Sequence, residues 1–369
     1  MTDNIQSFTD TPQGYRGGVR RPILSLVLPV YKAEKYLAPC LDSILAALKG
    51  ADAKESVEVF CIDDGSPDRC GEILEAYRGR FEDATLPCRV KYEVVHQKNA
   101  GESGARNEGI RRAQGEWLWI IDDDDSISPH SISYLMRVLR EHPVDHLRFG
   151  YQESESQDTP IPFEEHPISF FDLTTADGVR SAARQNLLHL VQWRGCIRRS
   201  ILDNVRFHED LTLGGDLVFG TEVDARTSTL ATSGTVLYNY VPNDGSGSRV
   251  LSAKKLKSVL EKSRLQLETI RGWSQGAVAL PFFLKGERDW MCWAHKAIKQ
   301  LPPDDCRQLM PLYYAQFARL YADCPVRRTL FRLHCGWLVL LCQSASLAVR
   351  KNMLRLGVVR RLKVLIRGY

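Results

Sequence analysis

Short apolar runs alternate with amphipathic segments along the first 141 residues of the chain. The run from Ile23 to Val30 is almost wholly apolar, whereas the apolar residues between Tyr36 and Leu48 recur at helical spacing. This change of period repeats along the chain. Such alternation is typical of an α/β fold whose mostly parallel sheet is covered by helices. The pattern predicts strands at 23–30, 57–62, 89–95 and 116–121, with helices at 36–48, 71–80, 103–113 and 131–141.

The pattern is weaker in the second part of the chain. Acidic residues and prolines over 151–168 indicate a loop, and a helical pattern extends over 174–200. A further helix is predicted around 218–230 and a strand at 234–240. After a Gly- and Ser-rich loop the chain is helical and basic to its end. We therefore expect a loose leader (1–22), an α/β domain (23–250) and a basic helical C-terminal region (251–369).

Charge is distributed unevenly between these regions. Residues 1–250 hold 27 basic and 38 acidic side chains, whereas 251–369 hold 22 basic and 7 acidic ones. Opposite signs suggest a catalytic or binding body joined to a region that meets an anionic partner. Ten cysteines without a CxxC pair or zinc-type spacing predict reduced thiols and a cytoplasmic location. The leader lacks the apolar core of a signal peptide, and no run reaches the roughly 18 to 20 apolar residues of a spanning helix.

The stretch from Trp117 to Asp125 ends an apolar strand in four consecutive carboxylates, Asp122 to Asp125. Like charges on adjacent residues repel, and carboxylates at the edge of a buried sheet are tolerated mainly when they are paired or bind a cation. Such hard oxygen ligands suit Mg²⁺ or Mn²⁺, which complete their coordination with waters and substrate phosphates. The run therefore indicates a diphosphate-bearing substrate. The alternative is a solvated acidic turn that binds nothing.

Three segments upstream of this run share its position at predicted strand ends: Val27-Leu-Pro-Val-Tyr31, Ile62-Asp-Asp-Gly-Ser-Pro-Asp68 and Asn99-Ala-Gly-Glu-Ser-Gly-Ala-Arg-Asn-Glu-Gly109. In this order and spacing they closely resemble the inverting family 2 glycosyltransferases of bacterial envelope and capsule synthesis, which have the GT-A fold. The resemblance covers about residues 23–130 and is thinner over 190–250. It implies transfer of a sugar from a nucleotide-sugar donor, with UDP as the expected nucleotide, to a hydroxyl of a glycan or lipid-linked acceptor.

The resemblance also implies which residues bind the donor. Pro29 and Tyr31 end the first strand and turn the chain out beside the nucleotide, unless they merely terminate that strand. Asp63 is expected to accept hydrogen bonds from the uracil or the ribose, because an ionised carboxylate only accepts. Asn99 and Gly101 allow the tight loop that precedes the next helix.

Arg106 is expected in the first turns of that helix, whose amino end can face phosphate. It either contacts the phosphate or nucleotide directly, or pairs with Asp64 or Asp122 and shapes the site. Asp64 and Asp68 are also explained by an ordinary turn with a helix cap.

Family members commonly have Asp-Ser-Asp-Asp where this chain has four aspartates, so the resemblance makes Asp122 and Asp124 the DXD pair. Asp124 is the predicted direct ligand of Mn²⁺ or Mg²⁺, and Asp122 is predicted to contact the metal or the ribose. Asp123 stands where the family has serine and is expected to be a spectator. The cation would neutralise the charge that grows on the departing nucleoside diphosphate.

An inverting transfer needs a base on the opposite face of the sugar to deprotonate the attacking hydroxyl. The family usually places this base in a Glu-Asp pair, which here becomes Gly215-Asp216. Asp216 is the predicted base, because Tyr238-Asn-Tyr240 follows it as the family's tyrosine pair normally does. A competing register places the pair at Glu209-Asp210.

Trp193 is a candidate for the acceptor site because an aromatic face can stack on a sugar, although a lone Trp more often belongs to the core. The Gln-x-x-Arg-Trp motif of processive synthases does not occur, so we expect one sugar to be transferred per encounter. A nucleotidyltransferase would need a Gly-x-Gly-x-Arg loop after the first strand, which the sequence before Lys32 does not supply. A non-catalytic relative that keeps nucleotide binding and acts as an assembly partner is the remaining rival, and Gly215 is the feature that favours it.

The last 45 residues, 325–369, contain ten Lys or Arg and no Asp or Glu, interleaved with apolar residues. Such a segment can lie on an anionic bilayer with its apolar side in the headgroup boundary. It is predicted to hold the protein at the inner face of the plasma membrane. The alternatives are a helical hairpin that packs on the acidic body and a contact with nucleic acid, and no nucleic-acid-binding fold is evident.

Overall fold

The computed structural model describes residues 22–52, 55–189, 191–243 and 252–320. Strands and helices alternate through its first part, as the hydrophobic pattern predicts, and each predicted end lies within two residues of the observed one. These elements are β1 (Leu24–Val30), α1 (Leu37–Leu48), β2 (Ser56–Asp63), α2 (Cys70–Phe81), β3 (Arg89–His96), α3 (Gly101–Arg112), β4 (Trp117–Ile120) and α4 (Ser131–Glu141).

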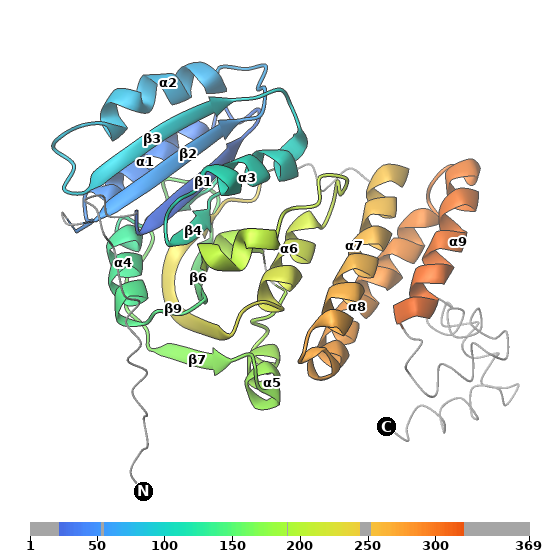
Figure 1. Ribbon diagram of the computed structural model, residues 1–369. Coiled ribbons are helices and arrows are strands. Elements are labelled where there is room, and N and C mark those ends of the chain that lie inside the picture. Colours follow the sequence, from blue (N-terminus) through green and yellow to red (C-terminus); the bar gives the residue numbers. More distant parts are fainter. Residues whose placement is uncertain (1–21, 53–54, 190, 244–251, 321–369) are drawn as a thin grey trace, which may run out of the picture.

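The second part adds five strands and two helices to this unit within the described residues. They are β5 (Ser126–Ile127), β6 (His146–Glu153), β7 (Ile168–Asp172), α5 (Ala176–Arg184), β8 (Gly195–Arg198), α6 (Gly215–Asp224) and β9 (Thr229–Tyr240), with short 3₁₀ helices at Gln192–Arg194 and Arg199–Asn204. The described strands form one mixed sheet in the order β3-β2-β1-β4-β8-β6-β9-β5, and β7 pairs with β9 (Figure 1). Strands β1 to β4 are parallel, whereas β8 is antiparallel to both of its neighbours.

Alternate residues of β1 enter two separate apolar cores, which is why the strand is buried along its whole length. Leu26 and Leu28 pack in the core that α1, α2 and α4 cover, whereas Val27 packs with Ala105 and Ile110 of α3. A parallel strand that is covered on both faces requires a continuous apolar run, and the sequence of β1 supplies one.

Two sequence predictions in the second part are wrong. Over 174–200 the chain forms an α-helix only in α5, and β8 follows as a short strand inserted between β4 and β6. The helix predicted around 218–230 ends at Asp224, and Leu230 already belongs to β9. A strand of four residues is too short to show a period of its own, and an apolar residue at a strand start can coincide with helical spacing.

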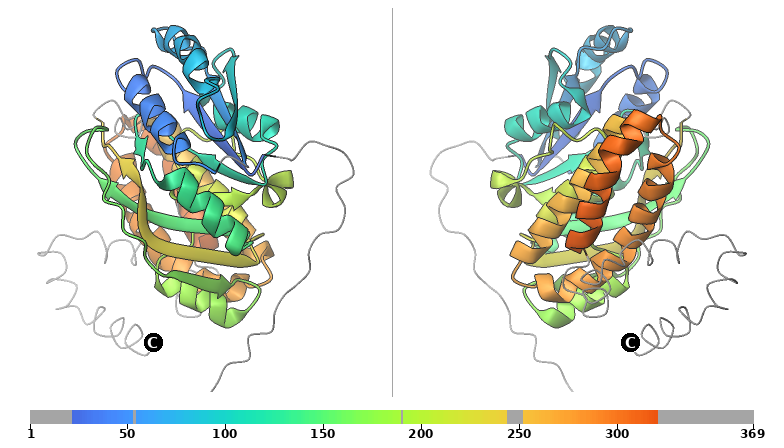
Figure 2. Two further views of the ribbon diagram at one scale, coloured as in Figure 1. Left: turned by 90° about the vertical axis from the view of Figure 1, so that its left-hand side faces the viewer. Right: turned by 90° about the vertical axis from the view of Figure 1, so that its right-hand side faces the viewer.

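Three long helices follow the sheet: α7 (Ala253–Gly272), α8 (Gly276–Ile298) and α9 (Pro303–Leu320). They lie side by side against the part of the molecule that contains α5 and α6 (Figure 2). Their core includes residues of the sheet unit, since Val179 of α5 and Leu230 of β9 belong to the same cluster as Phe283 of α8. The boundary predicted near residue 250 therefore separates elements that share a core.

The described helices include none that combines the length and the apolar character needed to cross a bilayer. Seven cysteines lie in the described ranges, and all are free thiols. Almost all of the predicted leader and the whole of the basic segment 325–369 lie outside the described residues.

Candidate active site

The carboxyl ends of β1, β2 and β3 meet at one edge of the sheet. In register, Val30 of β1 pairs with Asp63 of β2, and Asp63 pairs with His96 of β3. The chain after each strand end carries the polar segments that the sequence singled out. Ligands of open α/β sheets bind at this edge, so its side chains define the candidate site.

Asp64 ties the loop before α3 to the end of β2. Its carboxylate accepts the backbone N–H groups of Ala100 and Gly101, both at 2.8 Å, and the side-chain amide of Gln97 at 2.7 Å. The side-chain amide of Asn99 donates to the Asp64 carbonyl at 3.0 Å. Gly101 has a φ of 80°, a left-handed conformation that favours glycine. Asp64 thus serves the amino end of α3, where an acceptor meets otherwise unpaired N–H groups.

Asp63 has a partner on each carboxylate oxygen. The N–H of Ser66 donates to Oδ1 at 2.9 Å, and Nδ1 of His96 lies 2.8 Å from Oδ2. This hydrogen bond with Asp63 raises the pKa of His96 above its usual range, and a longer contact of Nε2 with Glu75 acts in the same direction. The residue predicted to read the nucleoside is therefore already oriented by the protein.

We expect Asp63→Asn to lower the pKa of His96, because the variant removes the acceptor that stabilises the imidazolium most. Glu75→Gln is the matched control, and it should lower that pKa less, since the contact of His96 with Glu75 is 3.4 Å long. Titration of the His96 ring protons by NMR measures both variants. A larger drop in Glu75→Gln than in Asp63→Asn would contradict the assignment.

Arg106 lies under this edge, 5% exposed, and its Nη2 contacts two carboxylates. It is 2.8 Å from Oδ1 of Asp122 and 2.5 Å from Oε1 of Glu102. The predicted pairing with Asp122 is present, and within the described residues Arg106 forms no ion pair with Asp64. The guanidinium offers several donors in a fixed plane, so it holds Asp122 in one orientation.

The four aspartates of the acidic run point to different partners. The N–H of Tyr31 donates to Oδ2 of Asp123 at 3.0 Å, so the presumed spectator connects the ends of β1 and β4. Asp125 is fully buried and accepts the Tyr238 hydroxyl at 2.7 Å. The same hydroxyl accepts the N–H of Asp122 at 3.1 Å. Tyr238 thereby fixes both ends of the run.

Burial and mutual repulsion raise the pKa values of these carboxyl groups. Burial, with the added repulsion of Asp122, raises the pKa of Asp124 to about 6. Burial together with Asp122 and Asp124 raises the pKa of Asp125 to about 8. A cation bound beside these groups would offset the repulsion and favour their ionised form.

The donor set at this position fits a hard cation that takes most of its ligands from a diphosphate and water. Asp122 and Asp124 each have one carboxylate oxygen engaged, by Arg106 and by the side-chain amide of Asn243 respectively. The amide oxygen of Asn243 is buried without a hydrogen-bond partner, beside Asp124. No group of three or more His, Cys, Asp or Glu side chains in the described ranges converges as a metal site. Mg²⁺ is commonly bound through one or two carboxylates plus substrate phosphates, which matches this arrangement.

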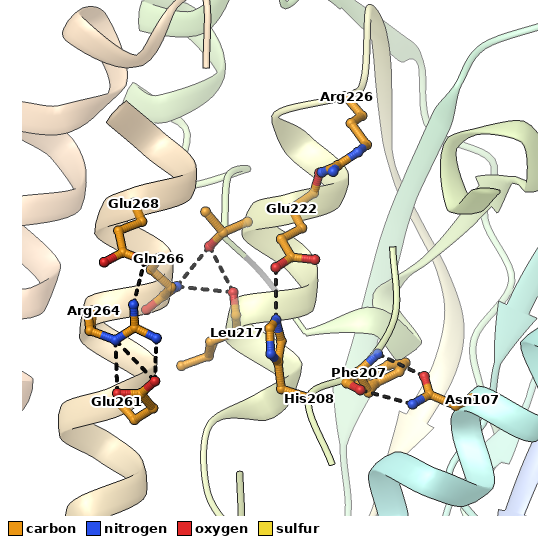
Figure 3. A network of polar contacts seen from close by, with 11 residues as sticks. Asn107, Phe207, His208, Leu217, Glu222, Arg226, Glu261, Arg264, Gln266 and Glu268 are labelled. Atoms are coloured by element: carbon orange, nitrogen blue, oxygen red, sulfur yellow. Dashed lines mark hydrogen bonds and ion pairs between the residues drawn. The ribbon is translucent and has the colours of Figure 1, made fainter. Parts of the chain in front are cut away.

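Asp216 reaches the site because α3 holds the segment that precedes α6. Asn107 exchanges two hydrogen bonds with the backbone of Phe207, at 2.8 and 2.9 Å (Figure 3). The side-chain amide of Asn107 also donates to Glu209 at 2.9 Å. The ring of Phe207 lies 5.2 Å from the guanidinium carbon of Arg106. Residues about 100 positions apart in sequence are thus brought together.

The two candidate bases lie in different surroundings. Burial raises the pKa of Asp216, and the charge of Arg106 opposes this change. Burial raises the pKa of Asp122, and the charge of Asp216 adds to this rise. Asp210 is exposed, and its charge acts on His208. The predicted register at Asp216 therefore supplies a buried aspartate whose charge acts on Asp122, whereas the aspartate of the competing register is exposed.

Residues 25–205 match the sequence model of Glycosyl transferase family 2. This part of the chain belongs to the family. The uncharacterized glycosyltransferase EpsJ of Bacillus subtilis strain 168 is 28% identical over 227 residues, which cover 60% of this chain and 62% of EpsJ. The minor teichoic acid biosynthesis protein GgaB of the same organism is 23% identical over 270 residues, covering 71% of this chain and 28% of GgaB. The matches thus span about three fifths of EpsJ and under a third of GgaB.

The fold resembles that of S. aureus TarS 1–349, whose crystal structure is in complex with UDP-GlcNAc. The TM-score is 0.61 at 19% identity, and the likeness covers 82% of each chain. At this identity the likeness identifies the fold alone. This family 2 chain thus has the GT-A fold that the motifs predict, with helices after the sheet.

Pro29 and Tyr31 lie at the end of β1. Pro29 is the last residue but one of this strand, which continues to Val30. The missing N–H of Pro29 faces β4 beyond the last paired residues, Val27 and Ile120, so no ladder hydrogen bond is lost. Tyr31 follows the strand and is 44% exposed.

Trp193 packs against the tyrosine pair of β9. Its ring stacks on Tyr238 at 4.7 Å and on Tyr240 at 5.6 Å between centroids. Tyr151 meets it edge on at 5.1 Å. Trp193 therefore packs against Tyr238 and stabilises its position, and Tyr238 orients the acidic run. Sequence spacing alone gave no sign of this contact, because β9 joins the sheet on the far side of β6.

Proposed function

We propose that this chain is a metal-dependent inverting glycosyltransferase that moves a sugar from a UDP-linked donor to a hydroxyl of a glycan or lipid-linked acceptor. The observation that carries the proposal is the grouping of Asp122, Asp124 and Asp216 around the buried Arg106. Asp122 and Asp124 suit a cation bound to a diphosphate. Asp216 suits a base, since burial raises its pKa and makes its carboxylate a better proton acceptor.

The chemistry follows from these positions. Asp63 and Tyr31 hold the nucleoside at the ends of β2 and β1. Asp122 and Asp124 would hold the cation, which would supply positive charge against the leaving diphosphate. Asp216 takes the proton of the acceptor hydroxyl as its oxygen bonds to the anomeric carbon of the sugar. The bond from that carbon to the diphosphate oxygen breaks, and UDP leaves with the electron pair. Attack from the face opposite the diphosphate inverts the configuration.

The test is release of nucleoside diphosphate from a panel of UDP-, GDP- and CDP-linked sugars, with Mn²⁺ and with EDTA. We expect release from at least one UDP-sugar in Mn²⁺ and none in EDTA. Glycine at position 215 favours a nucleotide-binding protein without transferase activity as the second candidate. Metal-dependent binding of UDP without release from any sugar on the panel would support that candidate instead.

Lack of space for a Cβ does not explain the glycine at position 215. A Cβ there would lie 3.5 Å from the Ser103 hydroxyl and 3.8 Å from Leu211, which are ordinary contacts. Space for a Cβ thus exists at position 215. Glu102 places a carboxylate at Arg106, and this carboxylate supports a working site without a glutamate at 215.

For the acceptor, we infer a cell-surface polysaccharide or its lipid-linked precursor. The support is that GgaB, a relative, is named a minor teichoic acid biosynthesis protein. The basic segment 325–369 supports a membrane surface as the place of reaction, because each Lys or Arg near an anionic leaflet contributes about 1 kcal/mol.

We expect the full chain to bind vesicles that contain anionic lipid and to leave vesicles of neutral lipid unbound. Raised salt should weaken this binding, because it screens the attraction of the ten cations of segment 325–369 for the lipid. Cosedimentation with the vesicles at low and high salt measures it. Equal binding to both kinds of vesicle, or none to either, would contradict the membrane proposal.

A further inference from the structure

Helix α7 presents three buried polar side chains to α6 at four-residue spacing. They are Ser258, Lys262 and Gln266, which are 5%, 1% and 2% exposed. Residues four apart lie on one face of a helix, so the three form a polar row. Polar groups at such positions cost free energy unless they are paired, and all three contact α6 or the loop before it.

Ser258 binds the loop immediately before α6. Its hydroxyl accepts the N–H groups of Thr212 at 2.9 Å and Leu213 at 3.1 Å, and it donates to the Leu213 carbonyl at 3.1 Å. A serine hydroxyl offers one donor and two acceptor lone pairs, so this side chain is fully used on two consecutive residues. The loop is therefore fixed to α7 just two residues from the start of α6.

Lys262 lies against Gly214, the N-cap residue just before α6, which has a φ of 82°. A Cβ at Gly214 would come within 2.8 Å of the Lys262 side chain, so the two are in close contact. The ammonium group is held by both oxygens of Glu287 in α8, each at 3.0 Å. Ser263 donates to the same carboxylate. Glu287 of α8 thus orients the Lys262 side chain, whose aliphatic part packs against Gly214.

Gln266 binds α6 on the C-terminal side of Asp216. Its side-chain amide donates to the Leu217 carbonyl at 3.0 Å and to the Thr221 hydroxyl at 2.8 Å (Figure 3). Asp216 therefore lies between the residues that α7 holds, with Gly214 before it and Leu217 after it. Arg106 of α3 faces it from the sheet unit.

We propose that Ser258, Lys262 and Gln266 are positioning residues that hold the Asp216 carboxylate where it accepts the proton of the acceptor hydroxyl. The inference rests on the proposed function, in which Asp216 is the base, and it assigns the helices after the sheet a part in the reaction. Misplacement of a reacting group by about 1 Å can cost roughly 10²-fold in rate. Loss of a contact on the loop should therefore lower turnover more than it lowers donor binding.

The test compares Ser258→Ala with Ser233→Ala in the full chain. Both remove a buried hydroxyl, but Ser258 binds the loop before α6, whereas Ser233 in β9 donates to the His166 carbonyl. Ser258→Ala should lower kcat at least about tenfold with the donor KM changed by less than about twofold, and amide hydrogen exchange at Thr212 and Leu213 should become faster. Ser233→Ala should leave kcat within about twofold of wild type, and Gln266→Met should behave like Ser258→Ala.

Faster exchange in Ser258→Ala without any loss of kcat would overturn the positioning role and leave the proposed function standing. Equal loss of kcat in Ser258→Ala and Ser233→Ala would also overturn it, since a general loss of stability then explains both. A wild-type chain that binds UDP and turns over no nucleotide sugar would overturn the proposed function, and the inference with it.

Discussion

Asp216→Asn is expected to reduce turnover by roughly 10² to 10⁴, the usual contribution of a general base, while UDP affinity stays near that of wild type. The amide is nearly the same size as the carboxylate and can still accept the Leu217 N–H, which lies 2.9 Å from Oδ1. It cannot take a proton at neutral pH. Because the diphosphate is proposed to bind at Asp122 and Asp124, the loss should appear in kcat and leave the Kd for UDP unchanged.

Asp210→Asn is the matched control for this experiment. Asp210 precedes Asp216 by six residues and belongs to the competing register, but it is exposed. Its amide variant should keep turnover within about twofold of wild type. Single-turnover kinetics with saturating donor and calorimetric titration of UDP measure the two quantities. If Asp210→Asn loses turnover and Asp216→Asn keeps it, the base is Asp210.

The second large effect is expected at Asp124. Asp124→Ala should lower the affinity for UDP in Mn²⁺ by at least about tenfold, or ~1.4 kcal/mol, and should remove the difference between Mn²⁺ and EDTA. The variant removes the Asp124 carboxylate, which accepts the side-chain amide of Asn243. Burial and the charge of Asp122 raise the pKa of Asp124 to about 6, and a bound cation would relieve both effects. Turnover should fall with the affinity.

Asp123→Ala is the control for Asp124→Ala. Its carboxylate accepts the Tyr31 N–H, so the variant loses one hydrogen bond between β1 and β4, worth about 1 kcal/mol of stability. UDP affinity should keep its dependence on Mn²⁺. Equal loss of metal-dependent affinity in both variants would refute the DXD register at Asp122 and Asp124.

The first part of the fold could be predicted from the sequence because its signals are local. Each strand from β1 to β4 is an apolar run that ends in a polar turn, and each following helix shows its own period. Parallel strands place their carboxyl ends at one edge, so Asp63 and the acidic run had to lie near each other. The structure agrees in order and bounds.

Contacts between distant segments could not be predicted in this way. Asp64 looked like a turn residue, but it holds the amino end of α3 across 36 positions. Tyr238 was predicted only through the family's tyrosine pair, and its bonds to Asp122 and Asp125 depend on how β9 enters the sheet. Ser258 lies in a helix whose sequence shows ordinary amphipathic spacing, and its contact with Leu213 becomes visible only in three dimensions.

Arg106 is a residue whose role could not be decided from the sequence. The sequence allowed phosphate contact or pairing with an aspartate, and the structure contains the pair with Asp122. Nε of Arg106 is buried and has no hydrogen-bond partner. The guanidinium thus fixes the first aspartate of the run and is itself held by Glu102. A role in shaping the site explains why Arg106 is buried. A side chain that only contacts phosphate would not need to be buried.

The most direct measurement is a crystal structure of the wild-type chain with UDP and Mn²⁺, with the cation located by its anomalous scattering. The account predicts Mn²⁺ between the diphosphate and the carboxylate of Asp124, the uridine beside Asp63, and Asp216 on the opposite side of the space left for the sugar. Another pocket, of about 610 Å³, is lined by Arg206, His208, Arg226 and Trp273. UDP bound in that pocket, or Mn²⁺ bound away from Asp122 and Asp124, would contradict the account.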